Sequence, residues 1–313
     1  MKFSDKAEDL SAFTGPSSAV TIGVFDGVHL GHRKVISRLI RTRREIGLSS
    51  AVLVTFDRHP LSVTHPDKAP PLLTTLEEKK GILREFDLDV VVIDRFNPGY
   101  AALNYTEFIR EKLLGRLNMS HLVVGYDFRF GKDRTGSLEM IREQGMRSSF
   151  EVTVVPPAYV GGQIVSSTRI REQLLRGDTE MASERLTRDY FFDAEVVRGE
   201  SIGRQISFPT ANLVVKESSK LIPRSGVYAV MVETEGGRYG GMMNIGTAPT
   251  IKNTGGIEVH IFDFSGDLYG STIRVYCRKN LREEKKFASR DQLREQLETD
   301  ARRARRVLAM PGR

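Results

Sequence analysis

The chain has 313 residues, more than one compact core usually holds, so we expect two domains. It is 40% hydrophobic and 28% charged, as globular proteins are, and no apolar run approaches the roughly 20 residues of a membrane-spanning helix. The N-terminus lacks the apolar segment of a secretory signal, so we expect a cytoplasmic protein with no membrane partner. The single cysteine, Cys277, excludes an internal disulfide and, by itself, a thiolate metal site.

The net charge of +7 is compatible with nucleic acid and with polyphosphate substrates alike. The basic residues are spread along the chain, so we expect no nucleic-acid partner. An arginine-rich stretch at 302–306 ends a helical pattern, where cations favour the helix dipole and a solvated face. Composition leaves the oligomeric state open.

Residues 19 to about 186 alternate short apolar runs with longer amphipathic segments. Buried strands are predicted at 19–24, 51–56, 90–93, 121–124 and 152–155. Apolar residues recur between them at helical spacing. This βαβ pattern predicts an α/β domain with a doubly wound, mostly parallel sheet that binds ligands at the carboxyl ends of its strands.

A glycine-bearing turn follows the run at 19–24, because residues 23–32 read Gly-Val-Phe-Asp-Gly-Val-His-Leu-Gly-His. His29 and His32, with the N–H groups of the helix that follows, can donate to phosphate oxygens, and Gly27 and Gly31 let the backbone approach closely. Adenylyl transfer to a phosphate needs no general base, since the attacking phosphate is already an anion. Two alternatives are a tight turn with surface histidines and a zinc site, which would need a third ligand.

A second phosphate motif is predicted at 165–171, Val-Ser-Ser-Thr-Arg-Ile-Arg, directly before an amphipathic run. The hydroxyls of Ser166, Ser167 and Thr168 can cap a helix, and with Arg171 one turn later they can bind the β- and γ-phosphates. Taken alone, the motif is more typical of a simple N-cap.

The pattern changes after residue 186, so we expect domains at 1–186 and 187–313. Strand-like runs at 191–197, 227–232, 239–244, 259–262 and 273–277 are separated by glycine-rich turns. They predict an antiparallel β-barrel, followed from about Ser289 by a helix with Leu293, Leu297, Ala301 and Ala304 on one stripe.

A polar turn in this second domain reads Gly-Arg-Gln-Ile-Ser-Phe-Pro-Thr-Ala-Asn-Leu at 203–213. Pro209 fixes the turn, and Thr210 and Asn212 after it are hard oxygen ligands of the kind that magnesium takes. Without further context, it is an ordinary polar turn.

Together these motifs resemble the bacterial riboflavin kinase/FAD synthetase family. Its adenylyltransferase module carries the His-x-Gly-His loop and a Ser-Ser-Thr-x-x-Arg segment, and its flavokinase module carries Gly-x-Pro-Thr-Ala-Asn. The resemblance extends to the segments 55–60, 124–131, 244–250, 257–263, 264–270 and 281–287 and covers about residues 21 to 300. One departure is Ser207, where the family usually has glycine.

The resemblance implies a bifunctional enzyme that phosphorylates riboflavin to FMN and then adenylylates FMN to FAD, with ATP as co-substrate of both steps and Mg²⁺ as cofactor. It implies catalytic roles for His29, His32, Arg171 and Glu258, the last as the base for the ribityl hydroxyl. It implies nucleotide or flavin binding by Gly23, Phe25, Asp26, Gly27, Gly31, His59, Asp127, Ser166, Ser167, Thr168, Gly203, Arg204, Pro209, Asn244 and Arg282. Thr210 and Asn212 are the implied magnesium ligands.

Two other functions are weighed against this one. The first is an adenylyltransferase for another nucleotide, with a non-catalytic barrel, and the Pro-Thr-Ala-Asn and Glu258 motifs argue against it. The second is a nucleic-acid-binding protein with an OB-like barrel. The chain has few aromatic residues interleaved with basic ones, which argues against that function.

Overall fold

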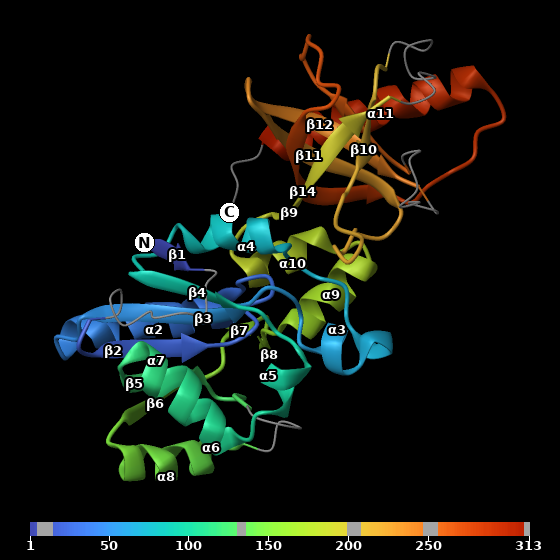
Figure 1. The fold of residues 1–313 in the computed structure, drawn as a ribbon. Helices are drawn as coiled ribbons and strands as arrows, with labels where there is room; N and C mark the ends of the chain where they lie inside the picture. The colour runs from blue at the N-terminus through green and yellow to red at the C-terminus, as the bar shows by residue number, and fades with distance from the viewer. Residues whose placement is uncertain (5–14, 130–135, 199–207, 247–255, 310–313) are drawn as a thin grey trace. The chain divides into compact units, whose positions relative to one another are not determined.

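A computed structural model describes residues 1–4, 15–129, 136–198, 208–246 and 256–309 (Figure 1). The chain divides into two compact units, Met1–Ser166 and Ser167–Arg313. Among the described residues, no helix has the length and apolar character needed to cross a bilayer.

The N-terminal unit contains a six-stranded sheet in the order β1-β4-β3-β2-β5-β6, and every neighbouring pair is parallel. Its strands are β1 (Lys2–Ser4), β2 (Ser18–Ile22), β3 (Ser50–Phe56), β4 (Val90–Asp94), β5 (Met119–Gly125) and β6 (Glu151–Val155). The predicted parallel sheet is confirmed. The run at 19–24 is not the first strand, however, because the three-residue β1, too short to show periodicity, pairs with β4 at the sheet edge.

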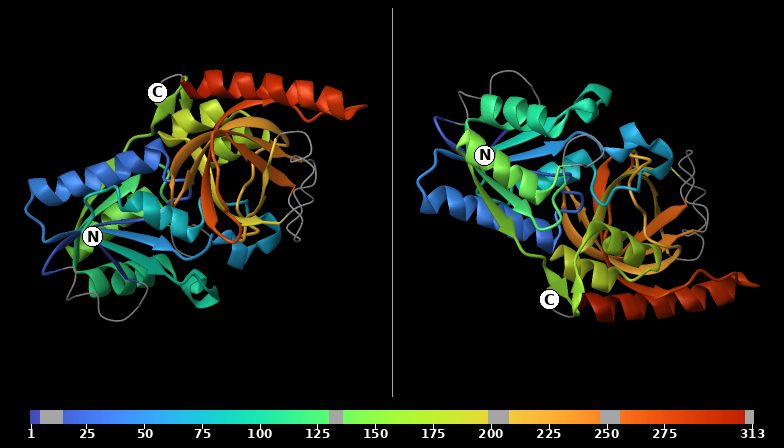
Figure 2. Two further views of the ribbon diagram at one scale, coloured as in Figure 1. Left: turned by 90° about the horizontal axis from the view of Figure 1, so that it is seen from above. Right: turned by 90° about the horizontal axis from the view of Figure 1, so that it is seen from below.

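Helices cover both faces of this sheet, as Figure 2 shows. They are α2 (Leu30–Glu45), α3 (Leu61–Thr64), η1 (Pro66–Lys68), α4 (Leu76–Leu83), α5 (Pro98–Ala102), α6 (Tyr105–Glu107), the π-helical η2 (Phe108–Leu114), α7 (Gly115–Leu117) and α8 (Leu138–Ser148). One face of β2 and β3 packs on η2, α7 and α8 through Leu113, Leu117 and Ile141. Because both faces are covered, β2, β3 and β4 are buried along their whole length.

The strand order reverses at β2. From β2 the chain adds β3 and β4 on one side, and then returns to add β5 and β6 on the other. The loop after β2 therefore lies at a topological switch point, where open parallel sheets bind their ligands. This is the position that the sequence predicts for the glycine and histidine motif.

The C-terminal unit contains a closed antiparallel barrel in the order β10-β13-β12-β11-β14-β9, seen from two further directions in Figure 2. Its strands are β9 (Tyr190–Val197), β10 (Ala211–Val214), β11 (Gly226–Thr234), β12 (Gly237–Ile245), β13 (Ile257–Ile261) and β14 (Thr272–Arg282). Helices α9 (Ser167–Leu175) and α10 (Thr179–Leu186) precede it, and α11 (Arg290–Ala309) follows. The predicted barrel and terminal helix are confirmed.

Two strand features were not predicted. The sequence interpretation treats 211–214 as the end of a polar turn, whereas the structure makes it β10, with only four residues after a proline. The hairpin of β7 (Tyr159–Val160) and β8 (Gln163–Ile164) also escapes a periodicity argument, because each strand has two residues.

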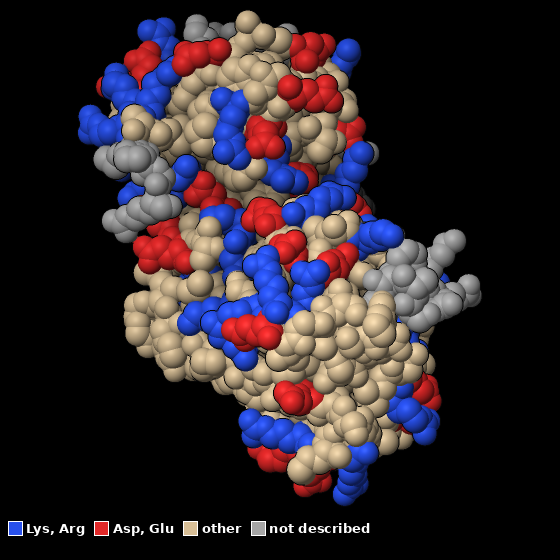
Figure 3. Space-filling view, turned by 90° about the vertical axis from the view of Figure 1, so that its left-hand side faces the viewer, with Lys and Arg blue, Asp and Glu red and all other residues tan. Residues whose placement is uncertain are grey.

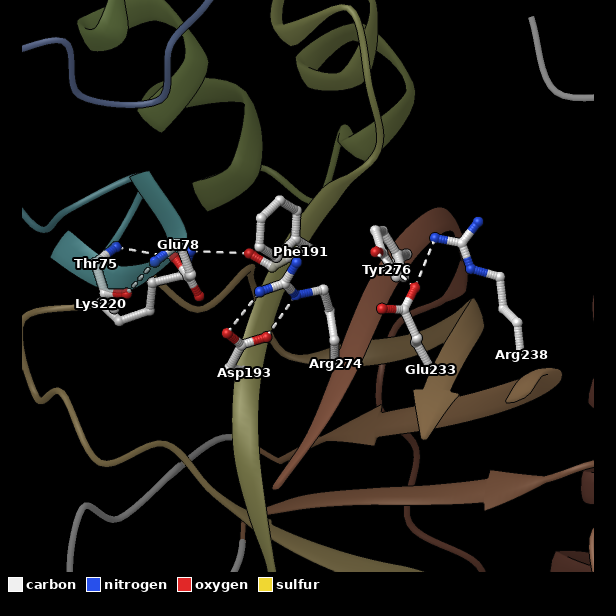
Figure 4. A network of polar contacts seen from close by, with 9 residues as sticks. All are labelled: Thr75, Glu78, Phe191, Asp193, Lys220, Glu233, Arg238, Arg274 and Tyr276. Carbon is white, nitrogen blue, oxygen red and sulfur yellow. Dashed lines mark hydrogen bonds and ion pairs between the residues drawn. The ribbon is translucent and has the colours of Figure 1, made fainter. Parts of the chain in front are cut away.

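Cross-strand polar pairs link the strands at one place on the barrel wall (Figure 4). Arg274 on β14 donates two hydrogen bonds to Asp193 on β9, at 2.6 and 2.8 Å. Tyr276 donates to Glu233 on β11 at 3.0 Å, and Arg238 on β12 pairs with the same carboxylate at 2.9 Å. These contacts fix the register of β9, β14, β11 and β12.

Cys277 on β14 is fully buried, and this burial raises the pKa of its thiol to about 12. The cysteine is therefore a packing residue. Outside the barrel, α11 packs with Leu297, Ala301 and Ala304 against Ala229 and Met242, which confirms the predicted apolar stripe.

Candidate active sites

The loop between β2 and α2 has an unusual backbone. Phe25, Gly27 and Val28 have φ angles of 50°, 80° and 39°, and this left-handed region is costly for a residue with a side chain. The side chains of Phe25 and Val28 are buried, with 3% and 0% of their surface exposed. Burial of these two side chains therefore helps to hold the loop in a strained conformation.

Asp26 and Gly27 tie this loop to the segment before α4. The Asp26 carboxylate accepts hydrogen bonds from the backbone N–H groups of Leu73 and Thr74, each at 3.0 Å. The Gly27 N–H donates to the Thr74 hydroxyl at 3.1 Å. These bonds give Asp26 a structural part in shaping the loop, beside the nucleotide role that the resemblance implies.

The two histidines of the motif form a stacked pair at the start of α2. Nδ1 of His29 caps the helix by accepting from the His32 N–H at 3.3 Å, so a neutral His29 carries its proton on Nε2. The ring centroids are 3.6 Å apart with 13° between the planes. A Cβ at Gly31 would lie 3.1 Å from Cε1 of His29, so the glycine makes room for the ring. The first turn of α2 contains no acidic residue, which suits an anion.

Gly23, His59 and Asp127 follow the carboxyl ends of β2, β3 and β5. These ends are neighbours, because β3 and β5 flank β2 in the parallel sheet. The Gly23 N–H donates to the carbonyl of Val54 at 3.0 Å. Nδ1 of His59 accepts from the Leu61 N–H at 3.2 Å and shapes the turn after β3. Asp127 is exposed in the turn after β5.

The second phosphate motif spans the division between the two units. Ser166 ends the N-terminal unit, whereas Ser167, Thr168 and Arg171 lie on α9 in the other unit. Arg171 is 8% exposed. The phosphate role of this motif stays a prediction.

In the barrel, strand register brings predicted residues into one row. Asn212 on β10 lies opposite Glu258 on β13, and Glu258 lies opposite Asn244 on β12. The row continues through Val227 on β11 to Arg282 on β14. Paired residues in adjacent strands share one face, so these four polar side chains lie on the same side of the barrel wall.

The turn before β10 is held against this row. The Thr210 hydroxyl donates to the Glu258 carboxylate at 3.1 Å. Nδ1 of His260, two residues along β13, lies 2.7 Å from the carbonyl oxygen of Pro209 and donates to it. Glu258 therefore lies in a central strand with a hydroxyl partner, and is not a glutamate on a solvated strand edge. Gly203, Arg204 and Ser207 are outside the described residues.

Arg282 ends β14, and its guanidinium is fixed by α11. Its Nε and Nη2 both lie 2.8 Å from Oδ2 of Asp300, which is completely buried, and Oδ1 of Asp300 accepts from Gln296 at 2.9 Å. Only 11% of the Arg282 side chain is exposed. A simple solvated loop arginine is thus excluded for this position.

The sequence analysis missed Asp300, His260 and a buried lysine, Lys79. Asp300 lies three residues after Leu297, on the apolar stripe of α11, and Lys79 lies three residues before Ile82 on α4. A charged residue on an apolar stripe is a signal that the sequence contained. His260 follows Glu258 by two residues, so strand alternation places both on one face.

No group of three or more histidine, cysteine or acidic side chains in the described part of the chain could hold a metal ion. Beside Glu258, the barrel offers a hydroxyl and an amide instead, from Thr210 and Asn212. Such oxygen donors fit a magnesium ion whose remaining ligands are phosphate oxygens and waters.

The two sites together define a nucleotide-dependent transferase with two domains. One unit presents paired imidazoles on a glycine-bearing loop at a helix N-terminus, and the other presents a carboxylate beside a hydroxyl and two amides. A family model described as FAD synthetase matches residues 14–169, and one described as riboflavin kinase matches residues 186–308.

Relatives match nearly the whole chain. The bifunctional riboflavin kinase/FMN adenylyltransferase of Escherichia coli (strain K12) is 37% identical over 312 residues, which cover 99% of each chain. That of Bacillus subtilis (strain 168) is 37% identical over 93% of each chain. A solved structure from Streptococcus pneumoniae, titled a macrolide-efflux protein, is 31% identical with a TM-score of 0.84, and the match covers 95% of this chain and 97% of that one. The chain belongs to the bifunctional riboflavin kinase/FMN adenylyltransferase family.

Proposed function

We infer that the chain makes both flavin cofactors. Its barrel phosphorylates riboflavin to FMN with ATP, and its α/β unit transfers AMP from ATP to FMN, which yields FAD and pyrophosphate. The observation that carries this conclusion is the row of Asn212, Glu258 and Asn244 on three neighbouring strands. A barrel that only bound a ligand would not need a carboxylate base beside Thr210, so this row disfavours a non-catalytic C-terminal domain.

For adenylyl transfer, we assign His29 and His32 to the α-phosphate. Nε2–H of His29 and the ring of His32 donate to the oxygens on which charge develops, and the N-terminus of α2 supports that charge. Gly23, Phe25, Gly27 and Gly31 shape the loop that receives the nucleotide. We assign Ser166, Ser167, Thr168 and Arg171 to the β- and γ-phosphates, and His59 and Asp127 to nucleotide and flavin placement.

For the kinase step, Glu258 accepts the proton of the ribityl hydroxyl as that oxygen attacks the γ-phosphorus of ATP. The hydrogen bond from Thr210 fixes the carboxylate, and the bond from His260 fixes the turn at Pro209. Thr210 and Asn212 would hold magnesium, which when bound neutralises charge on the transferred phosphate. We assign Asn244 and Arg282 to nucleotide or flavin binding, together with Gly203 and Arg204.

We place the boundary between the catalytic modules at 186/187. The start of the riboflavin kinase match at residue 186 supports this position, although the compact C-terminal unit begins earlier, at Ser167, and includes α9 and α10. Separate expression of residues 1–186 and 187–313 tests the boundary. We expect FAD synthesis from the first fragment and FMN synthesis from the second.

We propose small-molecule substrates only, in the cytoplasm, and no nucleic-acid partner. Lys and Arg side chains are interspersed with Asp and Glu on the face in Figure 3, as on a solvated surface. An open groove of about 580 Å³ lies beside α2 and is lined by basic residues of that helix and by residues 153–156. Arg33 there pairs with Glu85, and Arg38 and Arg41 pair with Glu45, so much of this charge is neutralised.

A time course tests the function. Purified protein is incubated with riboflavin, ATP and magnesium, and the flavins are separated by chromatography. We expect FMN first, then FAD with an equal amount of pyrophosphate. Absence of both flavin products would contradict the proposed function, and FAD synthesis from supplied FMN without FMN synthesis from riboflavin would favour the non-catalytic barrel.

A further inference from the structure

A buried lysine lies under the nucleotide loop. Lys79 on α4 is only 7% exposed, and its ammonium donates three hydrogen bonds. The acceptors are the carbonyl oxygen of Val24 at 3.2 Å, the hydroxyl of Thr55 at 3.0 Å and the carbonyl oxygen of Phe56 at 3.0 Å. Val24 belongs to the loop after β2, and Thr55 and Phe56 end β3. One ammonium thus joins the carboxyl ends of two neighbouring strands.

Further bonds make this connection rigid. The Thr55 hydroxyl, while it accepts from Lys79, donates to the carbonyl of Val24 at 3.0 Å. The start of α4 is fixed by a capping box in which Thr75 and Glu78 exchange hydrogen bonds. Thr74, the preceding residue, contacts Asp26 and Gly27 as described above. The loop that carries the histidines is therefore held to the α4 region at successive positions.

The ammonium is costly to bury. Desolvation lowers the pKa of Lys79 from 10.5 to about 8, against the opposing effect of two facing acids, Asp26 in the loop and Asp57 after β3. A hydrophobic side chain would pack here without that penalty, but it would remove the hydrogen bonds from Lys79 to the carbonyl groups of Val24 and Phe56 and to the Thr55 hydroxyl. The lysine is thus better explained by the bonds that it makes than by packing.

We propose that Lys79 is a positioning residue for adenylyl transfer. It holds the strained loop between β2 and α2 in the conformation that presents His29 and His32 to the nucleotide, and it does not contact the substrate itself. This inference rests on the proposed FMN adenylyltransferase function of the same unit.

The loss of the Lys79 proton at high pH distinguishes a positioning role from a purely structural one, because it should affect the reaction rate and the folding stability differently. Above pH 8 the folded chain loses the ammonium charge, and a neutral amine has two N–H groups for three acceptors. Between about pH 8 and 10.5 the unfolded chain still binds that proton, so this group makes folding more favourable as the pH rises. The rate of adenylyl transfer should therefore decline between about pH 8 and 10.5, although deprotonation of Lys79 does not destabilise the folded chain in this pH range.

The test uses the full-length enzyme with Lys79→Met and Lys79→Arg, and Lys80→Met as the matched control. Lys80 is the next residue on α4, and its ammonium pairs with the exposed carboxylate of Glu77. FAD formation from supplied FMN and FMN formation from riboflavin are measured on each preparation. Because misplacing catalytic groups by about 1 Å costs about 10²-fold, we expect kcat for FAD formation to fall by about 10²-fold in Lys79→Met. FMN formation and the Lys80→Met variant should stay within about twofold.

The pH dependence of FAD formation provides a second test of the proposal. We expect the wild-type rate to fall above pH 8 while the melting temperature does not, and the fall to be absent in Lys79→Arg, whose charge persists. Wild-type FAD formation in Lys79→Met would overturn the proposal. If Lys79→Met does not fold, the wild-type profile decides, and a rate that falls only in parallel with the melting temperature would overturn it. A wild-type enzyme that forms no FAD would instead contradict the proposed function.

Discussion

The two units position their reactive groups in different ways. In the N-terminal unit, the histidines lie on a loop whose conformation depends on its supports: the burial of its own Phe25 and Val28, and the hydrogen bonds that the N–H groups of residues 73 and 74 donate to Asp26. In the barrel, Asn212, Glu258 and Asn244 are aligned by the register of three paired strands. Activity at the histidine loop should therefore fall when the residues that hold the loop are changed. Activity at the barrel site should fall mainly when the reacting residues themselves are changed.

The largest expected effect is at the histidine pair. Replacing both His29 and His32 by Ala removes two donors from the developing charge, and one such donor is worth about 10² to 10³ in rate, so we expect FAD formation to fall by at least about 10³-fold. FMN formation from riboflavin, measured in the same sample, should be unchanged. A parallel loss of FMN formation would show that the two units do not act as separate sites.

Glu258→Gln tests the barrel site, because the glutamine side chain has nearly the same shape as glutamate. The amide cannot accept the ribityl proton, so we expect FMN formation to fall by about 10²-fold or more, as is usual when a general base is lost. FAD formation from supplied FMN is the control. Residual FMN formation near the wild-type rate would mean that another group accepts the proton.

Asp300→Ala tests the support of the barrel site. It leaves the Arg282 guanidinium poorly exposed and without its buried partner, and breaking such a pair typically costs about 3 kcal/mol. Urea unfolding of the C-terminal transition should show this loss. Arg305→Ala is the control, because its pairing with Asp263 is exposed and should contribute little. Equal effects of the two variants would contradict the account of Arg282.

The smallest expected effects compare two glycines. At Gly31, a Cβ would lie 3.1 Å from His29, whose ring is stacked on His32, so Gly31→Ala should displace the imidazole and lower FAD formation by about tenfold. At Gly81 on α4, a Cβ would meet nothing within 4 Å, so Gly81→Ala should keep full activity and stabilise the helix by about 0.5 to 1 kcal/mol. Thermal unfolding with activity assays measures both.

Most of the architecture was predictable because its signals are local. Buried parallel strands appear as apolar runs, amphipathic helices show their period, and the glycine and histidine motif identifies the end of β2. The shortest strands gave no such signal, since β7 and β8 have two residues each, β1 has three and β10 has four.

The site was predictable as a set of residues but not as a geometry. The alignment of Asn212 with Glu258 and Asn244 depends on pairing between strands far apart in sequence, and no local pattern specifies it. Lys79 and Asp300 could have been noticed as charges on apolar stripes. Their pairing with Val24 and with Arg282 could not be predicted, because tertiary contacts bring these residues together.

The most direct test of whether the two reactions use separate sites is a mixture of two variants, each of them impaired in one of the two reactions. Alone, Glu258→Gln should make at least about 10²-fold less FAD from riboflavin than the wild type, and the variant with Ala at His29 and His32 should accumulate FMN. An equal mixture of the two, supplied with riboflavin, ATP and magnesium, should form FAD, because FMN made by one is adenylylated by the other. A mixture that forms none, or a variant that loses both half-reactions, would contradict the account.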